Sequence, residues 1–116
     1  MGGLMALPPP MMSAAQSRSG AVAVRTTQVG LPVALRIDPR KLQGDPQALA
    51  DEILRLSRLA AMRAQVEIRR QLVEQGTDPQ VIRYAQLPTE DDLHDFEELN
   101  ERAQDEQSGD GWLRSV

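Results

Sequence analysis

The sequence contains no cysteine, which excludes disulfide bonds, thiolate metal sites and thiol nucleophiles. The absence of cysteine fits a reducing compartment, and we expect a cytoplasmic protein. Aromatic residues are also scarce, because the 116 residues include one Phe, one Tyr and one Trp. The core must therefore be built from aliphatic side chains. A chain of this length buries only a modest fraction of its surface, and oligomerisation is a common remedy.

Residues that carry catalytic or metal chemistry are few. His94 is the only histidine, and the acidic residues around it are more typical of an exposed helix than of a metal site. The sequence shows no nucleophile–base arrangement, no glycine-rich phosphate loop and no nucleotide-binding fingerprint. Asp38 and Asp45 are better explained as a turn residue and a helix cap than as an acid–base pair. We therefore expect neither an enzyme nor a cofactor nor a metal site.

The N-terminal segment lacks the features of a targeting signal. It has no basic residue before Arg18 and is interrupted by three prolines at 8–10, so neither a signal peptide nor a membrane-spanning helix is predicted. Ala6 stands where N-myristoylation requires serine or threonine after Gly2. We expect residues 1–19 to form a disordered lead.

Acidic and basic residues are unevenly distributed along the chain. Residues 18–83 carry 11 Arg or Lys against 7 Asp or Glu, whereas residues 84–116 carry 2 against 10, for a net charge of −4. A basic body followed by an acidic segment suggests a surface for anions and a segment that competes for it. The alternative is that both halves are ordinary solvated surfaces.

Two antiparallel strands are predicted over residues 21–27 and 32–38, joined by a turn at Gly30. In each strand, aliphatic residues alternate with polar or small ones, which is typical of one buried and one exposed face. The apolar positions are Val22, Val24, Val33, Leu35 and Ile37. Pro39 ends the second strand.

A long helix is predicted from Asp45, an N-cap residue followed by Pro46, to Gly76, which suits a C-terminal cap. A helix of roughly thirty residues would be about 45 Å long, longer than two short strands can cover. Its distal half is therefore expected to pack against another subunit, and Leu42 to anchor the linker before it. The dimer-interface candidates are Leu59, Met62, Val66, Leu72 and Val73.

The C-terminal part, residues 77–116, is predicted to be an acidic helical extension. A short helix follows Asp78, and a second helix begins near Thr89 with acidic residues in its first turn. Residues 104–111 have the composition of a solvated tail. The candidates for binding a protein partner, on a narrow apolar edge, are Leu93, Phe96 and Leu99.

The basic residues of the body are almost all arginines, and Lys41 is the only lysine. Guanidinium groups suit bidentate contact with phosphate, so these residues are candidates for nucleic-acid binding. Acidic residues lie among them, and a salt-bridged helix surface is the alternative. The nucleic-acid-binding candidates are Arg25, Arg36, Arg40, Lys41, Arg55, Arg58, Arg63, Arg69 and Arg70.

Residues 19–75 resemble the YbaB/EbfC family of small bacterial nucleoid-associated proteins. The matching features are the glycine and alternating valines of residues 20–24, the turn at Gly30, the strand and Asp-Pro of residues 33–39, Leu42, and the helix entry at residues 45–53. The resemblance implies a small α+β fold that dimerises, and DNA binding with weak sequence preference. Related domains occur in actinobacterial proteins encoded with type VII secretion systems.

The sequence thus predicts an α+β fold, with a small antiparallel sheet, one long helix and a shorter acidic C-terminal helix, in a dimer. Residues 20–76 form its strand–strand–helix domain. One functional hypothesis is a non-enzymatic, nucleoid-associated DNA-binding homodimer that its acidic tail restrains. The alternative is a protein-interaction accessory, for example one associated with type VII secretion, that does not bind DNA. The Tyr-x-x-x-acid export signal is not matched, because Pro88 follows Tyr84 at the required spacing.

Overall fold

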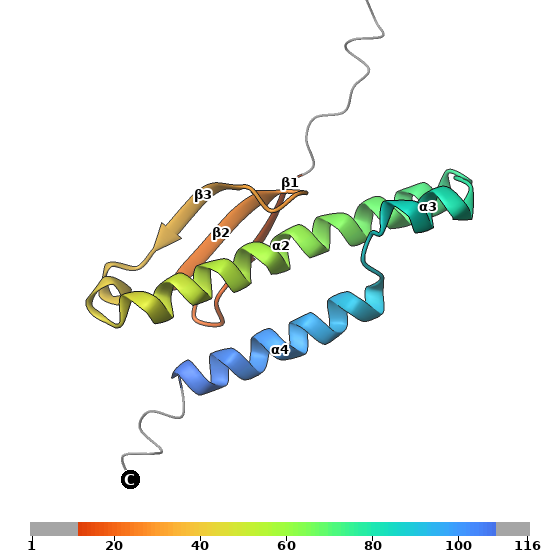
Figure 1. The fold of residues 1–116 in the computed structure, drawn as a ribbon. Coiled ribbons are helices and arrows are strands. Elements are labelled where there is room, and N and C mark those ends of the chain that lie inside the picture. Colours follow the sequence, from red (N-terminus) through yellow and green to blue (C-terminus); the bar gives the residue numbers. More distant parts are fainter. Residues whose placement is uncertain (1–11, 109–116) are drawn as a thin grey trace, which may run out of the picture.

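The computed structural model describes residues 12–108, which form a three-stranded sheet and a set of helices (Figure 1). This arrangement confirms the predicted α+β class. The elements, in chain order, are β1 (Met12–Gln16), β2 (Val22–Thr27), β3 (Pro32–Ile37), the 3-10 helix η1 (Pro39–Gln43), α2 (Pro46–Glu74), α3 (Pro79–Ala85) and α4 (Glu90–Ser108).

The sheet is antiparallel, with β2 between β1 and β3. Val24 is the partner of Ala15 on one side and of Leu35 on the other. A register irregularity between Arg25 and Thr26 interrupts the β2–β3 ladder, close to the turn that joins the two strands. Because directly opposed residues share a face, Ala15, Val24 and Leu35 all point to the same side of the sheet.

Strand β1 was not predicted. The expectation that residues 1–19 form a disordered lead is wrong for residues 12–19, which make a strand and a turn; residues 1–11 lie outside the described residues. The turn is closed by Ser17, whose backbone N–H donates to the carbonyl of Val22 at 2.8 Å and whose hydroxyl accepts from the Val22 N–H at 3.1 Å. A strand built from alanine and serine carries little β signal in sequence, which explains the error.

Helix α2 begins and ends as its sequence signals predict. The Asp45 carboxylate accepts a hydrogen bond from the Gln47 N–H at 3.0 Å, and Gly76 adopts a positive φ of 78° after the last turn. The helix packs on β1 and β2 through Leu56 and Ala60, which join Val22 and Val24 in the core. Its distal half extends beyond the sheet toward α3 (Figure 1).

The linker between β3 and α2 differs from its prediction. It forms η1, in which the Asp38 side chain accepts from the Arg40 N–H at 3.0 Å. Leu42 was expected to anchor this linker, but its side chain is 63 % exposed. The capping carboxylates of Asp38 and Asp45, rather than an apolar anchor, hold the two ends of the linker.

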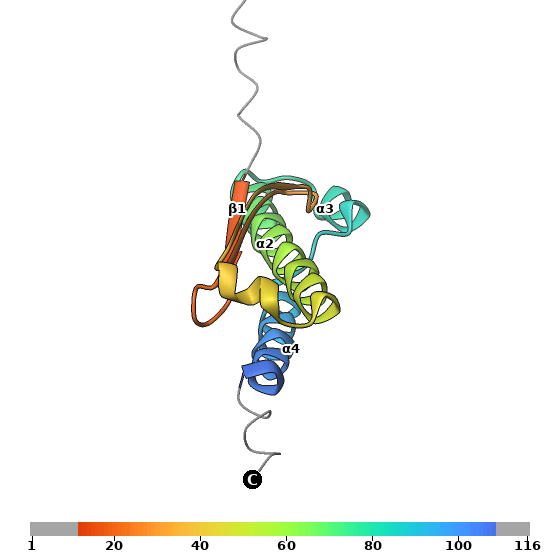
Figure 2. The same ribbon diagram turned by 90° about the vertical axis from the view of Figure 1, so that its left-hand side faces the viewer.

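Helix α4 lies along α2, on the side away from β3 (Figures 1 and 2). Leu93 and Phe96 pack against the core cluster, so they are already used within the chain. Phe96 also lines a groove described below, and Leu99 is 51 % exposed, so the prediction that the three residues bind a partner stays a prediction. The helix continues to Ser108, and buried Gln104 accepts from the Arg18 N–H at 2.6 Å. The solvated tail predicted from residue 104 thus starts too early.

Candidate functional site: an uncovered apolar face and a groove

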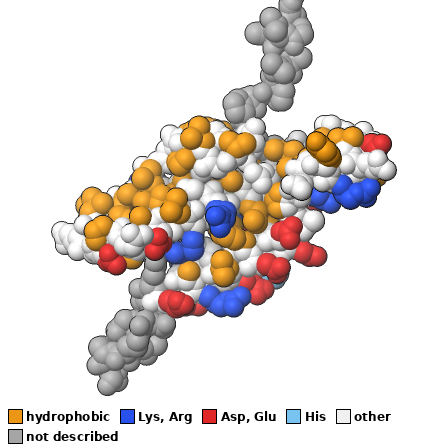
Figure 3. All heavy atoms as spheres, in the orientation of Figure 1, with side chains coloured by type: hydrophobic (Ala, Val, Ile, Leu, Met, Phe, Trp, Pro, Cys, Tyr) orange, Lys and Arg blue, Asp and Glu red, His pale blue; other side chains and the backbone are white. Residues whose placement is uncertain are grey.

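The side of β3 that faces the core is left open. Leu35 and Ile37 lie opposite Val24 and Val22, on the side of the sheet where these two valines are buried, and Val33 lies at the register irregularity without a partner in β2. Val33, Leu35 and Ile37 are defined here as the β3 face. Val24 is 2 % exposed, whereas Val33 and Leu35 are 46 % and 49 % exposed. The reason is that α2 packs on β1 and β2 and scarcely reaches β3. Hydrophobic side chains accordingly gather where Figure 1 draws β3 and the start of α2 (Figure 3).

The backbone of β3 is open as well, because the strand lies at the edge of the sheet. The Asp38 N–H donates to the carbonyl of Ala21 at 2.7 Å, so Asp38 faces β2. Since hydrogen-bonding direction alternates along a regular antiparallel strand, Arg36 also faces β2, and the N–H and C=O groups of Leu35 and Ile37 point outward. Leu35 and Ile37 therefore offer both apolar side chains and free backbone groups.

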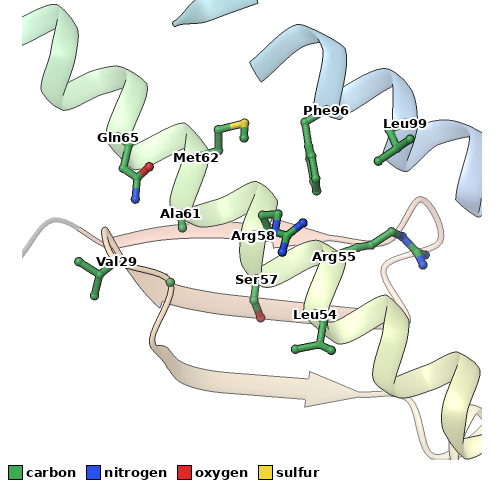
Figure 4. A pocket seen from close by; sticks show the side chains of 11 residues that line it. Val29, Leu54, Arg55, Ser57, Arg58, Ala61, Met62, Gln65, Phe96 and Leu99 are labelled. Carbon is green, nitrogen blue, oxygen red and sulfur yellow. The ribbon is translucent and has the colours of Figure 1, made fainter. Parts of the chain in front are cut away.

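A groove of about 510 Å³ runs along α2 beside this face. We call it the α2 groove. Its floor includes Leu54, Arg58 and Met62 of α2, and Phe96 and Leu99 point into it from α4 (Figure 4). The β2–β3 turn forms the opposite wall of the groove. The residues that line the whole groove are Val29, Gly30, Leu54, Arg55, Ser57, Arg58, Ala61, Met62, Gln65, Phe96 and Leu99.

The turn meets α2 at Gly30, which has a φ of 89°. This backbone conformation is the reason for a glycine at the position. A Cβ there would lie 3.6 Å from the Cβ of Ala61, an ordinary contact distance. Gln65 then fixes the turn, since its side-chain amide donates to the carbonyl of Gln28 at 2.6 Å.

The two ends of the grooved surface differ in charge. Arg55 and Arg58 lie at one end, and a neighbouring hollow that shares Met62 and Phe96 continues to Asp92 and Asp95 at the other. The Arg55 guanidinium donates to the buried Asn100 side chain at 3.4 Å. The backbone N–H and hydroxyl of Thr89 lower the pKa of Asp92 below its usual value, which keeps this carboxylate ionised.

The nine predicted nucleic-acid-binding residues are not brought together. Arg40 pairs with Asp38 at 2.9 Å, and the hydrogen bonds from the Arg40 side chain and backbone lower the pKa of Asp38 to about 2. Lys41 lies 3.4 Å from the buried carboxylate of Glu52. Both cations are therefore occupied by neighbours on the chain.

The arginines of distal α2 are mostly held by α4 and the segment before it. Arg63 pairs with Glu97 at 3.6 Å, and Arg70 pairs with Glu67 and, at 3.4 Å, with Glu90. The Arg69 guanidinium donates to the Leu87 carbonyl at 3.3 Å. The acidic helix and the segment before it thus contact arginines that the sequence had suggested as phosphate-binding residues.

Three of the predicted cations have no hydrogen-bond or ion-pair partner among the described residues. Arg25 and Arg36 project from the outer face of the sheet, opposite α2, where small residues such as Ala23 and Ala34 surround them. Arg58 lies on the other side of the molecule, in the α2 groove. The free arginines therefore form no single basic patch.

Arg18 was not predicted as a functional residue, yet it ties the sheet to α4. Its guanidinium binds Asp105 at 2.7 Å and Glu101 at 3.3 Å, and the Asp105 carboxylate is the main cause of its raised pKa. These partners lie more than eighty residues away in the chain, and no sequence spacing points to such a pair.

The predicted dimer interface is partly wrong. Leu59 and Val66 are buried inside the chain, between α2 and its neighbours, so they offer no surface to a second subunit. Met62 lines the α2 groove, Leu72 is half-buried and Val73 is exposed on distal α2. Sequence analysis missed the residues that are open instead, above all Val33 and Leu35, because their alternation predicts a covered face.

The described part of the chain contains neither a metal-binding group nor a membrane-spanning helix. No group of three or more His, Asp or Glu side chains there could hold a metal ion. His94 lies on α4 with its Nε2 atom 3.1 Å from a Glu98 oxygen. No helix between residues 12 and 108 is both long and apolar enough to cross a membrane.

Comparison with known proteins gives no further assignment. No family model, no curated protein and no solved structure matches this chain. The resemblance to the YbaB/EbfC family therefore stays a prediction from sequence.

Proposed function

We propose that the protein is a non-enzymatic interaction module that binds a protein partner across the β3 face and the adjoining α2 groove. The observation that carries this proposal is the half-exposed state of Val33 and Leu35 on an edge strand, with Leu35 on the core side of the sheet. Contiguous exposed apolar surface marks protein–protein or membrane interaction sites and ligand-binding grooves. A partner would bury side chains that the chain itself leaves in water.

The energy at stake is sufficient for a specific contact. Complete burial of a valine or leucine side chain stabilises a complex by roughly 1.5–3 kcal/mol, and a side chain already half-buried gains about half of this. The α2 groove adds further exposed apolar residues, namely Val29, Leu54 and Leu99. Arg58 lines the same groove, so the surface favours a partner that is apolar with an acidic group.

The test compares two substitutions on the same strand. Leu35→Glu places a charge on the β3 face, whereas Ala34→Glu places the same charge on the outer face, where its neighbours are exposed. With the full-length protein as bait in nuclease-treated cell extract, we expect partners captured by the parent chain to be lost with Leu35→Glu and kept with Ala34→Glu. Equal capture by both variants would overturn the proposal, provided that circular dichroism shows both folded.

DNA association is the second candidate function, and a specific observation supports it. Arg25 and Arg36 are exposed, unpaired and flanked by small side chains on the outer face of β2 and β3. Flat surfaces with free guanidinium groups suit contact with phosphates. Against this stand the net charge of −4 and the acidic partners of Arg40, Lys41, Arg63 and Arg70.

Gel shifts at low salt test the DNA hypothesis. Replacing Arg25 and Arg36 together with alanine should weaken binding and reduce the salt slope by about 1.8, as expected for two lost phosphate contacts. Arg83→Ala is the matched control, because Arg83 is an exposed arginine on α3. No shift by the parent protein at any salt concentration excludes this function.

The acidic segment can also be tested as a brake on DNA binding. Removal of α4 is unsuitable, because Leu93 and Phe96 pack on the core. Exchange of Glu90 and Glu97 for glutamine instead removes the α4 ion-pair partners of Arg70 and Arg63 while keeping the helix, and Arg70 retains its contact with Glu67. If these arginines contact phosphate, the double variant binds DNA more tightly than the parent; unchanged affinity shows that α4 is not a brake.

A further inference from the structure

We propose that residues 109–116, the segment that follows α4, bind the α2 groove of their own chain through Trp112 and Leu113. These residues lie outside the described part of the chain. The segment would cover part of the surface to which the proposed function assigns a partner, so its role as a regulator of partner binding rests on that proposed function. The docking itself involves no partner and can be measured on the chain alone.

The segment starts at the end of the groove where the arginines lie. Helix α4 runs back along α2 (Figure 1), and Arg55 near the start of the groove donates to Asn100 of α4. Ser108, the last residue of α4, therefore lies beyond this end of the groove. Gly109 follows directly, and glycine is the residue that most readily lets a chain change direction after a helix. A chain that turns back here enters the groove from its arginine end.

The length of the segment matches the distance that it must cover. Leu99 lies nine residues before Ser108, which corresponds to about 14 Å along a helix. Trp112 lies four residues after Ser108, and four extended residues span up to about 14 Å. Trp112 and Leu113 can therefore reach Leu99, which is 51 % exposed. Leu54, which is 67 % exposed, lies in the same part of the groove (Figure 4).

The order of charges in the segment also matches the order of charges along the groove. Asp110 precedes the apolar pair and Arg114 follows it. In a segment that runs back along α4, Asp110 would be closest to the arginine end, and six extended residues would bring Arg114 up to about 20 Å from Ser108. Asp95 of the neighbouring acidic hollow lies thirteen residues before Ser108, or about 20 Å along the helix. The acid of the segment thus meets bases, and its base meets an acid.

Tryptophan suits the cation of the groove that has no partner. Arg58 lines the groove and has no hydrogen-bond or ion-pair partner among the described residues. Tryptophan is the aromatic side chain that attracts a guanidinium group most strongly, and Trp112 is the only tryptophan of the chain. The N-terminal residues 1–11 are the other segment outside the described part, and they contain no charged side chain. They match the apolar part of the groove only.

The docked segment would limit access to the groove. Residues 109–111 are a short link between α4 and Trp112, and a short linker holds its ligand at an effective concentration on the order of millimolar. A separate partner must therefore compete with the segment for the α2 groove, whereas the β3 face stays open.

Tryptophan fluorescence tests the docking directly, because selective excitation reports Trp112 alone. We expect the full-length chain to emit at shorter wavelength, and to be quenched less by acrylamide, than a synthetic peptide of residues 105–116. Leu54→Glu charges the groove and should return both values to those of the peptide. Ala34→Glu, on the outer face of the sheet, should leave them unchanged, and circular dichroism checks that both variants fold.

Two results would overturn the inference. One is emission and quenching of the parent chain equal to those of the peptide, which would place Trp112 in water. The other is a blue shift that persists in folded Leu54→Glu, which would place Trp112 on another surface.

An exchange of charges tests the direction of the segment. Arg114→Asp brings like charges together at the acidic end and should weaken the blue shift, and a second substitution, Asp95→Arg, should restore it. Glu98→Arg is the matched control for the second substitution, because Glu98 is an exposed acid of α4 that lines neither the groove nor the neighbouring hollow. Equal recovery with Asp95→Arg and Glu98→Arg would overturn the proposed direction.

The inference and the proposed function fail in different ways. A solvent-exposed Trp112, with capture that still depends on Leu35, would refute the docked segment only. A docked Trp112, with equal capture by Leu35→Glu and Ala34→Glu, would refute the partner proposal only. If both hold, Trp112→Ala should increase partner capture by opening the groove, and unchanged capture would overturn the regulatory role.

Discussion

β2 and β3 carry a similar alternation of apolar and other residues, but their core-side faces lie in different surroundings. Val22 and Val24 of β2 are buried beneath α2, whereas Leu35 of β3, directly opposite Val24, remains about half exposed on the same side of the sheet. The difference arises because one helix about 10–12 Å wide covers about two strands spaced about 4.8 Å apart. Alternation thus identifies the apolar face of a strand but not what covers it.

The largest expected effect contrasts a core residue with a residue of the β3 face. Leu56→Ala removes a buried α2 side chain that packs with Val22 and Val24, so we expect a loss of roughly 2–5 kcal/mol in the free energy of unfolding. Leu35→Ala should cost less than about 1 kcal/mol at concentrations that keep the protein monomeric, because that side chain is already half in water. Urea denaturation followed by circular dichroism measures both. Similar losses for the two variants would show that β3 is covered after all.

A smaller effect is expected in the turn that joins the two strands. Gly30→Ala should destabilise the fold by about 1 kcal/mol, because φ at this position is 89° and alanine disfavours that region. Gly44→Ala is the control, since Gly44 has a φ of −89° and its added methyl group meets only ordinary contacts. Thermal unfolding compares the two variants. A loss at Gly44 as large as that at Gly30 would contradict the backbone explanation.

The smallest effect concerns the end of β3. The pKa of Asp38 is lowered to about 2 by Arg40, so its stabilising contribution is complete above its ordinary value near 4. As the pH falls from about 4 to about 2, this contribution to the stability of the fold is lost, because protonation of the Asp38 carboxylate ends its contact with Arg40. NMR titration of the Asp38 carboxyl should show the low pKa in the parent chain and a value closer to 4 in Arg40→Gln. An unchanged pKa in the variant would assign the shift to another group.

Sequence analysis predicted the local features well where a single residue type fixes the backbone. Asp45, Pro46 and Gly76 mark the ends of α2 because a carboxylate can cap free N–H groups and a glycine can adopt positive φ. The strands containing Val24 and Leu35 follow from their alternation. Strand β1 was missed, since its small and polar residues have no such signature and its hydrogen bonds come from β2.

The candidate site was predictable only in part. The sequence identified Arg25, Arg36 and Arg58 as nucleic-acid-binding candidates, but it grouped them with arginines that α4 engages. It also identified the apolar edge of α4, of which Leu99 alone remains half exposed. Contacts between α2 and α4 depend on how the chain folds back, and residue spacing does not reveal them.

The sequence by itself determined the elements of this protein: two strands, a long capped helix and an acidic helix, through backbone preferences that act over a few residues. The tertiary structure alone decided which of these elements cover one another. It buried Leu59 and Val66 within the chain, paired Arg63 with Glu97, and left Val33 and Leu35 open. The physical reason is that coverage depends on the width and placement of whole helices on the sheet, which no local pattern of residues encodes.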